Sequence, residues 1–464
     1  MATTTTPRTL DEDKWSPARI IPTSGIGGQD EQERRATSAL LAVLSVVPEF
    51  AKSVLGNLGA PAGTVTTFVE VRLDDGQGNI SIPDGAIVVK RGKTRWACLV
   101  EVKTGAARLQ VEQVDRYLDL CRSHQFDALL TISSEITPSP KDLPVALDGR
   151  KLRRTVVRHL SWWHLLTEAI VHREYRGIPD PEQAWILGEL IAYLDNERSG
   201  ASGFQDMGDQ WTGVRDAARQ GTLRASEPRV RAIAERWEQL LQYLALGLRQ
   251  DLGRPVSVVT PRGSTLKDRL DAASKLLCDE GRLRSAIKVP HAVANLMIEA
   301  DLRSRLMVTW AEVPLPQEGR PKTRITWLLR QLATAPDDVR LEAVYPNARE
   351  AVVVSLAQAR ETPEALLFPS DPKRQPRSVR VCIARELGTK RGRAPGSFVH
   401  ATKSQSVSYY REILQSLSGW RPKAPKLPAG EEPEPYASEE PPPFSSANGR
   451  APGEGRDPQQ GDGS

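Results

Sequence analysis

The chain has 464 residues and a formal net charge of +5, with 26% charged residues. This length suits roughly two to four domains with a sizeable core, and the mild basicity is compatible with a polyanionic partner. The four cysteines lack C-x-x-C spacing, which argues against a zinc site or a disulfide framework. No apolar run has membrane length and no secretion signal is visible, so we expect a cytoplasmic protein without a membrane segment.

The first elements are predicted by polarity alone. Residues 1–28 are polar and interrupted by glycine, and we expect them to form a flexible lead. A helix is predicted over 29–47, because apolar residues recur at helical spacing and Pro48 cannot continue it. Residues 64–73 alternate in polarity, which predicts the first strand of a sheet.

Two runs rich in β-branched residues follow, at 86–90 and 96–102, and the turn-like residues between them predict a hairpin. Asp84 precedes the first strand, and Glu101 and Lys103 end the second. Because alternate side chains share one face of a strand, Glu101 and Lys103 should lie together. Two carboxylates and an ammonium at one sheet edge suit Mg²⁺, which takes few carboxylates and leaves positions for water and phosphate.

Pro83-Asp84 followed by Glu101-Val102-Lys103 resembles the signature of the PD-(D/E)xK, restriction-endonuclease-like nuclease superfamily. A helix predicted over 106–123 carries Gln113 and Tyr117 four positions apart, and this pair is similar to an extra motif of the exonuclease-like branch. A buried strand is predicted at 126–132, so the elements follow one another as in the core of that family. The resemblance covers residues 29–175 only.

The resemblance implies an α/β fold with a mixed sheet flanked by helices, and a Mg²⁺-dependent nuclease for which Mn²⁺ can substitute. It implies that Asp84 and Glu101 bind the metal and that Lys103 assists the attacking water or the phosphate. Gln113 and Tyr117 would then position the substrate or the lysine.

A glutamate on the first helix often completes the metal site in the resembling family. Glu33 is the candidate here, with Glu31 behind it, and Glu70 on the first strand is a weaker one. Acidic residues at the start of a helix also complement its dipole, and this explanation is equally good for either helical glutamate alone.

Each of the other candidates has an ordinary structural explanation too. Charged residues on a hairpin are usually solvated, and a lysine at the end of a strand protects a sheet edge. Their order and their placement on the predicted elements favour the active site. The alternative is a catalytically inactive nuclease-fold protein that acts as a DNA-binding or protein-interaction scaffold.

A further strand is predicted at 153–160, followed by a helix for which Ser161 is a suitable N-cap, and by another helix at 182–195. His159, His164 and His172 lie close in sequence. They are not predicted to form a metal site, because the oxygen-rich site upstream needs no imidazole.

Glu227-Pro228 predicts a boundary after a nuclease-like domain with a helical extension, 29–226. A long helix is predicted from 229 to 251 within a linking segment, 227–251, followed by an α+β domain of unrecognised fold, 252–420. Strands are predicted there at 256–260, 292–298, 306–311, 339–344, 351–356 and 378–384, and helices at 266–277, 323–333 and 405–417. Residues 421–464 are rich in proline, glutamate and glycine, which predicts a disordered tail.

Two basic stretches are candidate phosphate contacts, although a solvated surface is the commoner explanation of such runs. They contain Lys322, Arg324 and Arg330, and Lys390, Arg391 and Arg393.

We expect DNA as the partner, with RNA not excluded, and a role in defence against foreign DNA such as phage, or in repair. A homodimer or a larger defence or repair complex stays open.

Overall fold

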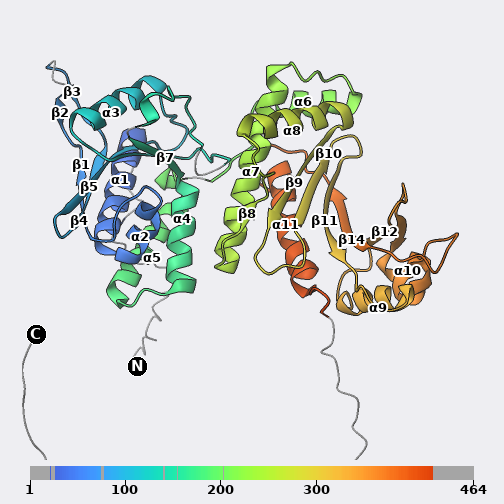
Figure 1. Ribbon diagram of the computed structural model, residues 1–464. Coiled ribbons are helices and arrows are strands. Elements are labelled where there is room, and N and C mark those ends of the chain that lie inside the picture. Colours follow the sequence, from blue (N-terminus) through green and yellow to red (C-terminus); the bar gives the residue numbers. More distant parts are fainter. Residues whose placement is uncertain are drawn as a thin grey trace, which may run out of the picture. The chain divides into compact units, whose positions relative to one another are not determined.

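The computed structural model describes residues 21, 27–74, 78–138, 142–153, 155–201 and 203–421 (Figure 1). It is a mixed α/β protein with a five-stranded mixed sheet and a separate seven-stranded antiparallel sheet, each accompanied by helices. The predicted tail after residue 421 and most of the predicted lead lie outside the described residues.

The five-stranded sheet is built from the first part of the chain. Its elements are α1 (Gln29–Val46), α2 (Pro48–Gly56), β1 (Thr64–Val69), β4 (Gly85–Arg91), β5 (Thr94–Val102), α3 (Val111–Ser123), β6 (Ala128–Ser133), β7 (Val156–Ser161), α4 (Trp162–Val171), η3 (His172–Arg176) and α5 (Pro181–Asp195). The strand order is β1-β4-β5-β6-β7; the first three strands pair antiparallel and the last three parallel. Helix α3 makes the crossover that the parallel pairing of β5 with β6 requires.

Smaller pieces complete this region. They are a two-stranded hairpin of β2 (Leu73–Asp74) and β3 (Ile80–Ser81), and the short helices η2 (Lys151–Arg153) and η4 (Glu197–Ser199).

Both faces of the sheet are covered. On β5, Cys98, Val100 and Val102 pack into a cluster with α1, α2, α4 and α5, whereas Leu99 packs into a second cluster with α3. This alternation is the two-residue period of a strand with helices on both sides. By the same alternation, the side chain of Glu101 lies on the same face of the sheet as that of Leu99, next to the end of β5 at Val102.

Local chemistry explains where the elements begin and end. Pro48 ends α1, as predicted, and also occupies the first turn of α2, a position that tolerates proline. The Ser161 hydroxyl accepts a hydrogen bond from the His164 backbone N–H at 3.1 Å, which confirms the predicted N-cap. The predicted first strand ends early, at Val69, because Glu70 adopts a left-handed φ of 50°. Helix α3 begins at Val111 rather than at 106.

The seven-stranded sheet has the order β13-β12-β14-β11-β10-β9-β8, with every pairing antiparallel. Its region contains α6 (Trp211–Gln220), α7 (Pro228–Leu252), β8 (Ser257–Val258), α8 (Leu266–Glu280), β9 (Arg282–Lys288), β10 (Leu296–Asp301), β11 (Leu306–Pro314), α9 (Pro321–Gln331), β12 (Arg340–Val344), β13 (Val352–Ser355), α10 (Leu356–Glu361), η5 (Pro363–Leu366), β14 (Ser378–Glu386), α11 (Phe398–Glu412) and η6 (Leu414–Ser416).

Helix α7 is more than a link between two parts. Its residues Trp237, Leu240 and Leu244 belong to the same hydrophobic cluster as the second sheet, and so do Trp211 and Val214 of α6. The boundary predicted at residue 226 therefore falls inside one packed cluster.

Some predicted bounds in this region were wrong. Strand β9 was not predicted, the strand placed at 292–298 lies at Leu296–Asp301, and the helix placed at 405–417 begins at Phe398. The last difference follows from the Ser397 side chain, which caps α11 by accepting from the His400 backbone N–H.

Among the described residues, no single helix is both long and apolar enough to cross a membrane. The pair α1 and α2 meets the length and composition test only when taken together, with a bend of 110° between its halves. Both helices contribute buried residues to the cluster under the five-stranded sheet.

Candidate active site at the end of the mixed sheet

Three side chains from two separate segments meet where β5 ends. The Lys103 ammonium lies 2.7 Å from Glu101 Oε1 and 3.0 Å from Glu33 Oε1, so it bridges a strand carboxylate and a helix carboxylate. Glu101 is almost fully buried, at 1% exposure, while Lys103 and Glu33 are partly covered. The structure thus brings Glu33 of α1 to the predicted Glu101–Lys103 pair, across about 70 residues of sequence.

Asp84 reaches the same end of the sheet from the neighbouring strand. Its Oδ2 accepts a hydrogen bond from the Val102 backbone N–H at 2.7 Å. Gly85 allows this approach, because a Cβ atom there would lie 2.5 Å from Leu41 Cδ1 and 2.8 Å from the Phe68 carbonyl oxygen. Only glycine lets β4 begin this close to α1 and β1, and Asp84 is placed by that contact.

The electrostatics of the cluster follow from burial and from the crowding of like charges. Burial and the neighbouring Asp84 charge raise the pKa of Glu101 to about 8, although Lys103 opposes the shift. Burial likewise raises the pKa of Glu33. For Lys103, burial alone lowers the pKa, but hydrogen bonding and attraction to Glu101 and Glu33 outweigh it, so the net pKa is raised. The ammonium is therefore charged at neutral pH.

The donor set fits a hard divalent cation. Glu101 Oε1 is buried and faces the Lys103 ammonium at 2.7 Å. Oxygen ligands from one or two carboxylates are what Mg²⁺ takes in proteins. In the part of the chain that the structure describes, no group of three His, Cys, Asp or Glu side chains is arranged as a ready metal site. In this cluster the ammonium bridges the carboxylates, and a cation would require it to turn aside.

A cleft opens beside the cluster, with a volume of about 710 Å³. Glu33 and Asp84 line it, together with Glu70, Arg34 and Arg72. The sequence analysis did not predict a role for the two arginines. In the sequence, only their position next to Glu33 and close to Glu70 points to the site.

Gln113 and Tyr117 meet each other on α3. The Gln113 side-chain amide donates to the Tyr117 hydroxyl at 3.3 Å, and Tyr117 is buried. Burial, and then the negative charge of Glu101, raise the pKa of Tyr117, which places this phenol in the field of the cluster. Within the described ranges no hydrogen bond joins the pair to Lys103, so the positioning role stays a prediction.

The two weaker glutamate candidates have other partners. Glu31 accepts from the Gly27 backbone N–H at 3.0 Å and pairs with Arg35 at 2.6 Å, so it acts at the start of α1. Glu70 pairs with Arg34 at 3.4 Å, with both side chains exposed in the wall of the cleft.

The basic stretch on α9 is less available than its composition indicates. Arg324 is buried and donates to Gln375 Oε1, so its guanidinium is not available to an external phosphate. Lys322 is exposed and pairs with Glu364, and Arg330 is exposed on the last turn.

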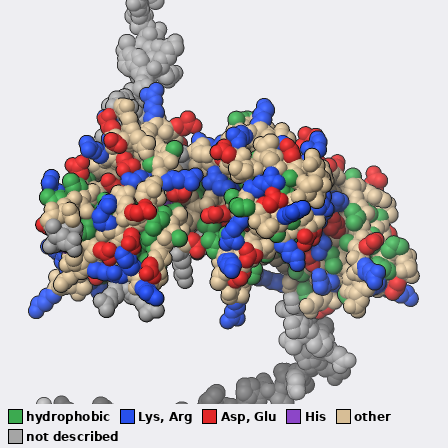
Figure 2. All heavy atoms as spheres, turned by 90° about the horizontal axis from the view of Figure 1, so that it is seen from above, with side chains coloured by type: hydrophobic (Ala, Val, Ile, Leu, Met, Phe, Trp, Pro, Cys, Tyr) green, Lys and Arg blue, Asp and Glu red, His purple; other side chains and the backbone are tan. Residues whose placement is uncertain are grey.

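In the second basic stretch, Arg391 pairs with Asp209 at 3.2 Å and Arg393 pairs with Glu197 at 3.3 Å, while Lys390 is exposed. Figure 2 shows Lys and Arg interspersed with Asp and Glu over the face it presents, rather than gathered into one band. A phosphate contact by these residues stays a prediction.

Comparison with known protein families, with characterised proteins and with solved structures found no match to this chain. The nuclease hypothesis therefore rests on the motif, on the order of the elements and on the geometry of the cluster.

Proposed function

We propose that this protein is a metal-dependent nuclease that hydrolyses phosphodiester bonds in DNA. The observation that carries the proposal is the convergence of Asp84, Glu101 and Lys103 at one end of β5, with Glu33 joined to the same ammonium. The order of the five-stranded sheet, three antiparallel strands and then parallel ones after a crossover helix, supports the restriction-endonuclease-like fold.

Asp84 and Glu101 would hold Mg²⁺ or Mn²⁺, with Glu33 as a third carboxylate. The ion, when bound, supplies Lewis-acid activation of the phosphodiester and of the attacking water. Lys103, freed from its carboxylate partners, would stabilise the charge that develops on the phosphate or orient the water. Gln113 and Tyr117 would line the approach to the cluster from α3.

Arg34 and Arg72 would contact phosphates on either side of the scissile bond, because they line the same cleft as the carboxylates. A nuclease of this kind would serve defence against foreign DNA or DNA repair, by analogy with the superfamily it resembles.

The test uses the purified full chain with linear, circular and single-stranded DNA and with RNA, in Mg²⁺ or in Mn²⁺. Asp84→Ala and Lys103→Ala are compared with Asp279→Ala and Lys275→Ala, which alter exposed residues of α8. Metal-dependent cutting that is lost in the first pair and kept in the second supports the enzyme. Nucleic-acid binding without cutting under any condition supports the scaffold and contradicts the proposal.

A further inference from the structure

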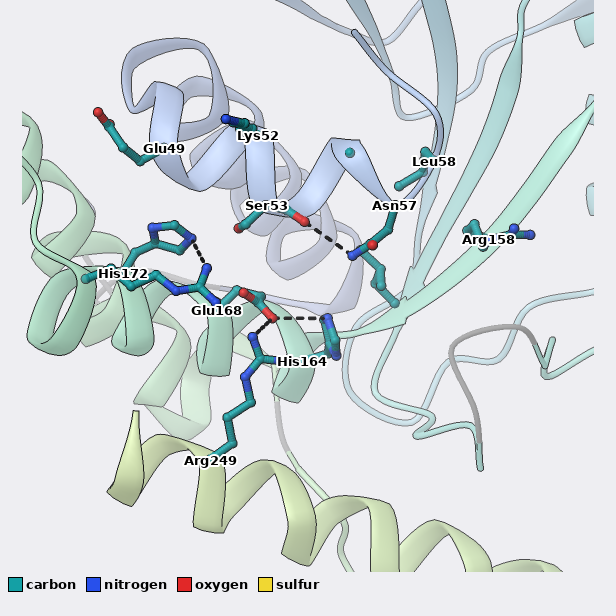
Figure 3. Close-up of a pocket in the computed structure, with 13 residues that line it drawn as sticks. Glu49, Lys52, Ser53, Asn57, Leu58, Arg158, His164, Glu168, His172 and Arg249 are labelled. Atoms are coloured by element: carbon teal, nitrogen blue, oxygen red, sulfur yellow. Dashed lines mark hydrogen bonds and ion pairs between the residues drawn. The ribbon is translucent and has the colours of Figure 1, made fainter. Parts of the chain in front are cut away.

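A second pocket, of about 780 Å³, is formed by α2, β7, α4, η3 and α7 (Figure 3). None of its lining residues belongs to the cleft beside the carboxylate–lysine cluster. Its size is that of a site for a small ligand. The nuclease proposal makes no use of it.

The lining of this pocket is unusually basic. Lys52, Arg158, Arg176 and Arg249 contribute four positive charges, and Glu49 and Glu168 contribute two negative charges. The two histidines in the wall add none at neutral pH, since burial lowers the pKa of His164 and of His172 to about 4. The wall therefore carries a net charge of +2.

One of these cations is already neutralised. Arg249 of α7 pairs with the buried Glu168 of α4 at 2.5 Å, and His164 Nε2 lies 3.7 Å from the same carboxylate (Figure 3). For Lys52, Arg158 and Arg176 there is no carboxylate within ion-pair distance in the described part of the chain. The excess charge is thus carried by side chains that remain available to a ligand.

His172 adds a buried donor to the wall. The residue is only 6% exposed, and its Nε2 accepts from the Arg176 guanidinium at 3.0 Å. An imidazole that accepts at Nε2 carries its proton on Nδ1, and this Nδ1 is buried without a partner. A buried donor left unpaired costs free energy that an acceptor in the pocket would recover. His172 also begins a π-helical turn, a feature frequent at functional sites.

An unpaired acceptor lies across from it. Glu49 Oε2 on α2 is buried without a hydrogen-bond partner, and its charge acts on His172. In Figure 3 the α2 residues Glu49 and Lys52 lie on the opposite side of the pocket from His164 and Arg249. A ligand that pairs with the cations and with Glu49 therefore carries both an anionic group and a hydroxyl that can donate a hydrogen bond to the Glu49 carboxylate.

We propose that this pocket binds a small phosphate ester with free hydroxyls, such as a sugar phosphate or a nucleoside monophosphate. A phosphate monoester carries a charge of about −1.5 to −2 at neutral pH, which matches the wall, and guanidinium groups bind its oxygens with two hydrogen bonds. Arg176, Lys52 and His172 Nδ1 hold the phosphate, and Glu49 accepts from a hydroxyl of the sugar.

The experiment is isothermal titration calorimetry of the full chain with inorganic phosphate, with ribose 5-phosphate and with adenosine monophosphate. EDTA is present throughout, so that no metal-dependent binding at the other site contributes. We expect ribose 5-phosphate or the nucleotide to bind at least about fivefold more tightly than inorganic phosphate. Arg176→Gln and Lys52→Met each weaken that binding by about tenfold or more, and Glu49→Ala removes the preference for the esters.

Two controls make the outcome decisive. Arg219→Gln, an exposed arginine of α6, and Lys103→Ala should leave binding unchanged. Binding that is lost in Lys103→Ala but kept in Arg176→Gln and Lys52→Met would place the ligand at the carboxylate cluster and overturn the proposal. The absence of heat with all three ligands at about 10 mM would overturn it too, whatever the result of the cleavage assay.

Discussion

The ion pairs of the two sheets differ in how far they are buried: the Arg282 side chain is 37% exposed, whereas those of Lys103 and Glu101 are 15% and 1% exposed. On the seven-stranded sheet, Asp301 lies directly across from Arg282 and Glu312 across from Arg380, and each pair closes at 3.1 Å. At the end of the five-stranded sheet, a single ammonium serves two carboxylates, and a third carboxylate stands beside them.

This difference distinguishes ion pairs that stabilise a sheet from the charged residues of the proposed active site. Cross-strand pairs at a sheet surface neutralise each other and stabilise the sheet modestly. The cluster at β5 holds three carboxyl groups and one ammonium in a largely buried place, and burial, followed by the nearby Asp84 charge, raises the pKa of Glu101 to about 8. An external cation would offset the crowding of carboxylates there. On the seven-stranded sheet the charges form partly exposed mixed groups, such as Arg282 with Glu280, Glu299 and Asp301.

The largest effect is expected from removing the charge of Glu101. Glu101→Gln should lower metal-dependent cleavage by about a thousandfold or more, because the amide is a poor ligand for a hard cation. The variant should unfold at about the same temperature as the wild type, because a Glu101 whose pKa is raised to about 8 is mostly protonated at neutral pH when no metal is bound. Single-turnover cleavage and thermal unfolding measure the two expectations.

Glu312→Gln is the matched control on the second sheet, and it should leave the cleavage rate within about twofold of wild type. An equal loss of activity in Glu101→Gln and Glu312→Gln would show that the carboxylate at β5 is no more important for cleavage than one on the seven-stranded sheet.

Gly85→Ala should have the next largest effect. The added Cβ would collide with Leu41 and the Phe68 carbonyl, so the start of β4 must shift and carry Asp84 with it. We expect a loss of about 1–3 kcal/mol in the free energy of unfolding and a clear loss of cleavage. Gly247→Ala in α7, where a Cβ meets nothing within 4 Å, should be neutral or stabilising. Urea unfolding compares the two, and equal stability of both variants would refute the steric argument.

A third prediction concerns pH. His159 lies buried on β7, with contacts to Thr131 and the Glu135 carbonyl, and burial lowers its pKa to about 4. Between its ordinary pKa of about 6.5 and its lowered pKa, the unfolded chain therefore binds a proton at this imidazole, whereas the folded chain does not. Stability should therefore fall as pH drops from 6.5 towards 4, by about 2 kcal/mol between pH 7.5 and 5 for this one group.

Urea unfolding of the wild type and of His159→Gln at the two pH values tests the expectation. The variant should lose less stability than the wild type on acidification. An identical loss would show that His159 is not the titrating group.

The smallest effect is expected on the second sheet. Arg377 is 65% exposed and pairs with Glu312 at 3.2 Å, and that glutamate keeps Arg380 and Ser378 as partners. Arg377→Ala should cost less than about 1 kcal/mol and leave cleavage unchanged. A larger loss in urea unfolding would show that the ion pairs of the second sheet carry more of the fold than their exposure indicates.

The site was predictable where chemistry is local in sequence. The two-residue period of a strand predicted that Glu101 and Lys103 would meet, and the family resemblance supplied Glu33, which lies within hydrogen-bonding distance of Lys103. The Ser161 cap was predicted for the same reason, because the hydroxyl of an N-cap and the backbone N–H that donates to it are three residues apart.

Features that could not be predicted depend on contacts between residues that are far apart in the chain. Arg324 is buried because Gln375, 51 residues further on, receives its guanidinium. The role of α7 in the core depends on a sheet that follows it, and the pocket beside His172 needs residues of α2, α4 and α7 to come together. None of these contacts leaves a periodic signal in the sequence.

The most direct test is an anomalous diffraction map of crystals of the full chain grown or soaked with Mn²⁺. We expect an ion bound by the carboxylates of Asp84 and Glu101, with the Lys103 ammonium turned away from Glu101. Mn²⁺ bound elsewhere, or a cluster that keeps its lysine bridge and takes up no ion at saturating concentration, would contradict it.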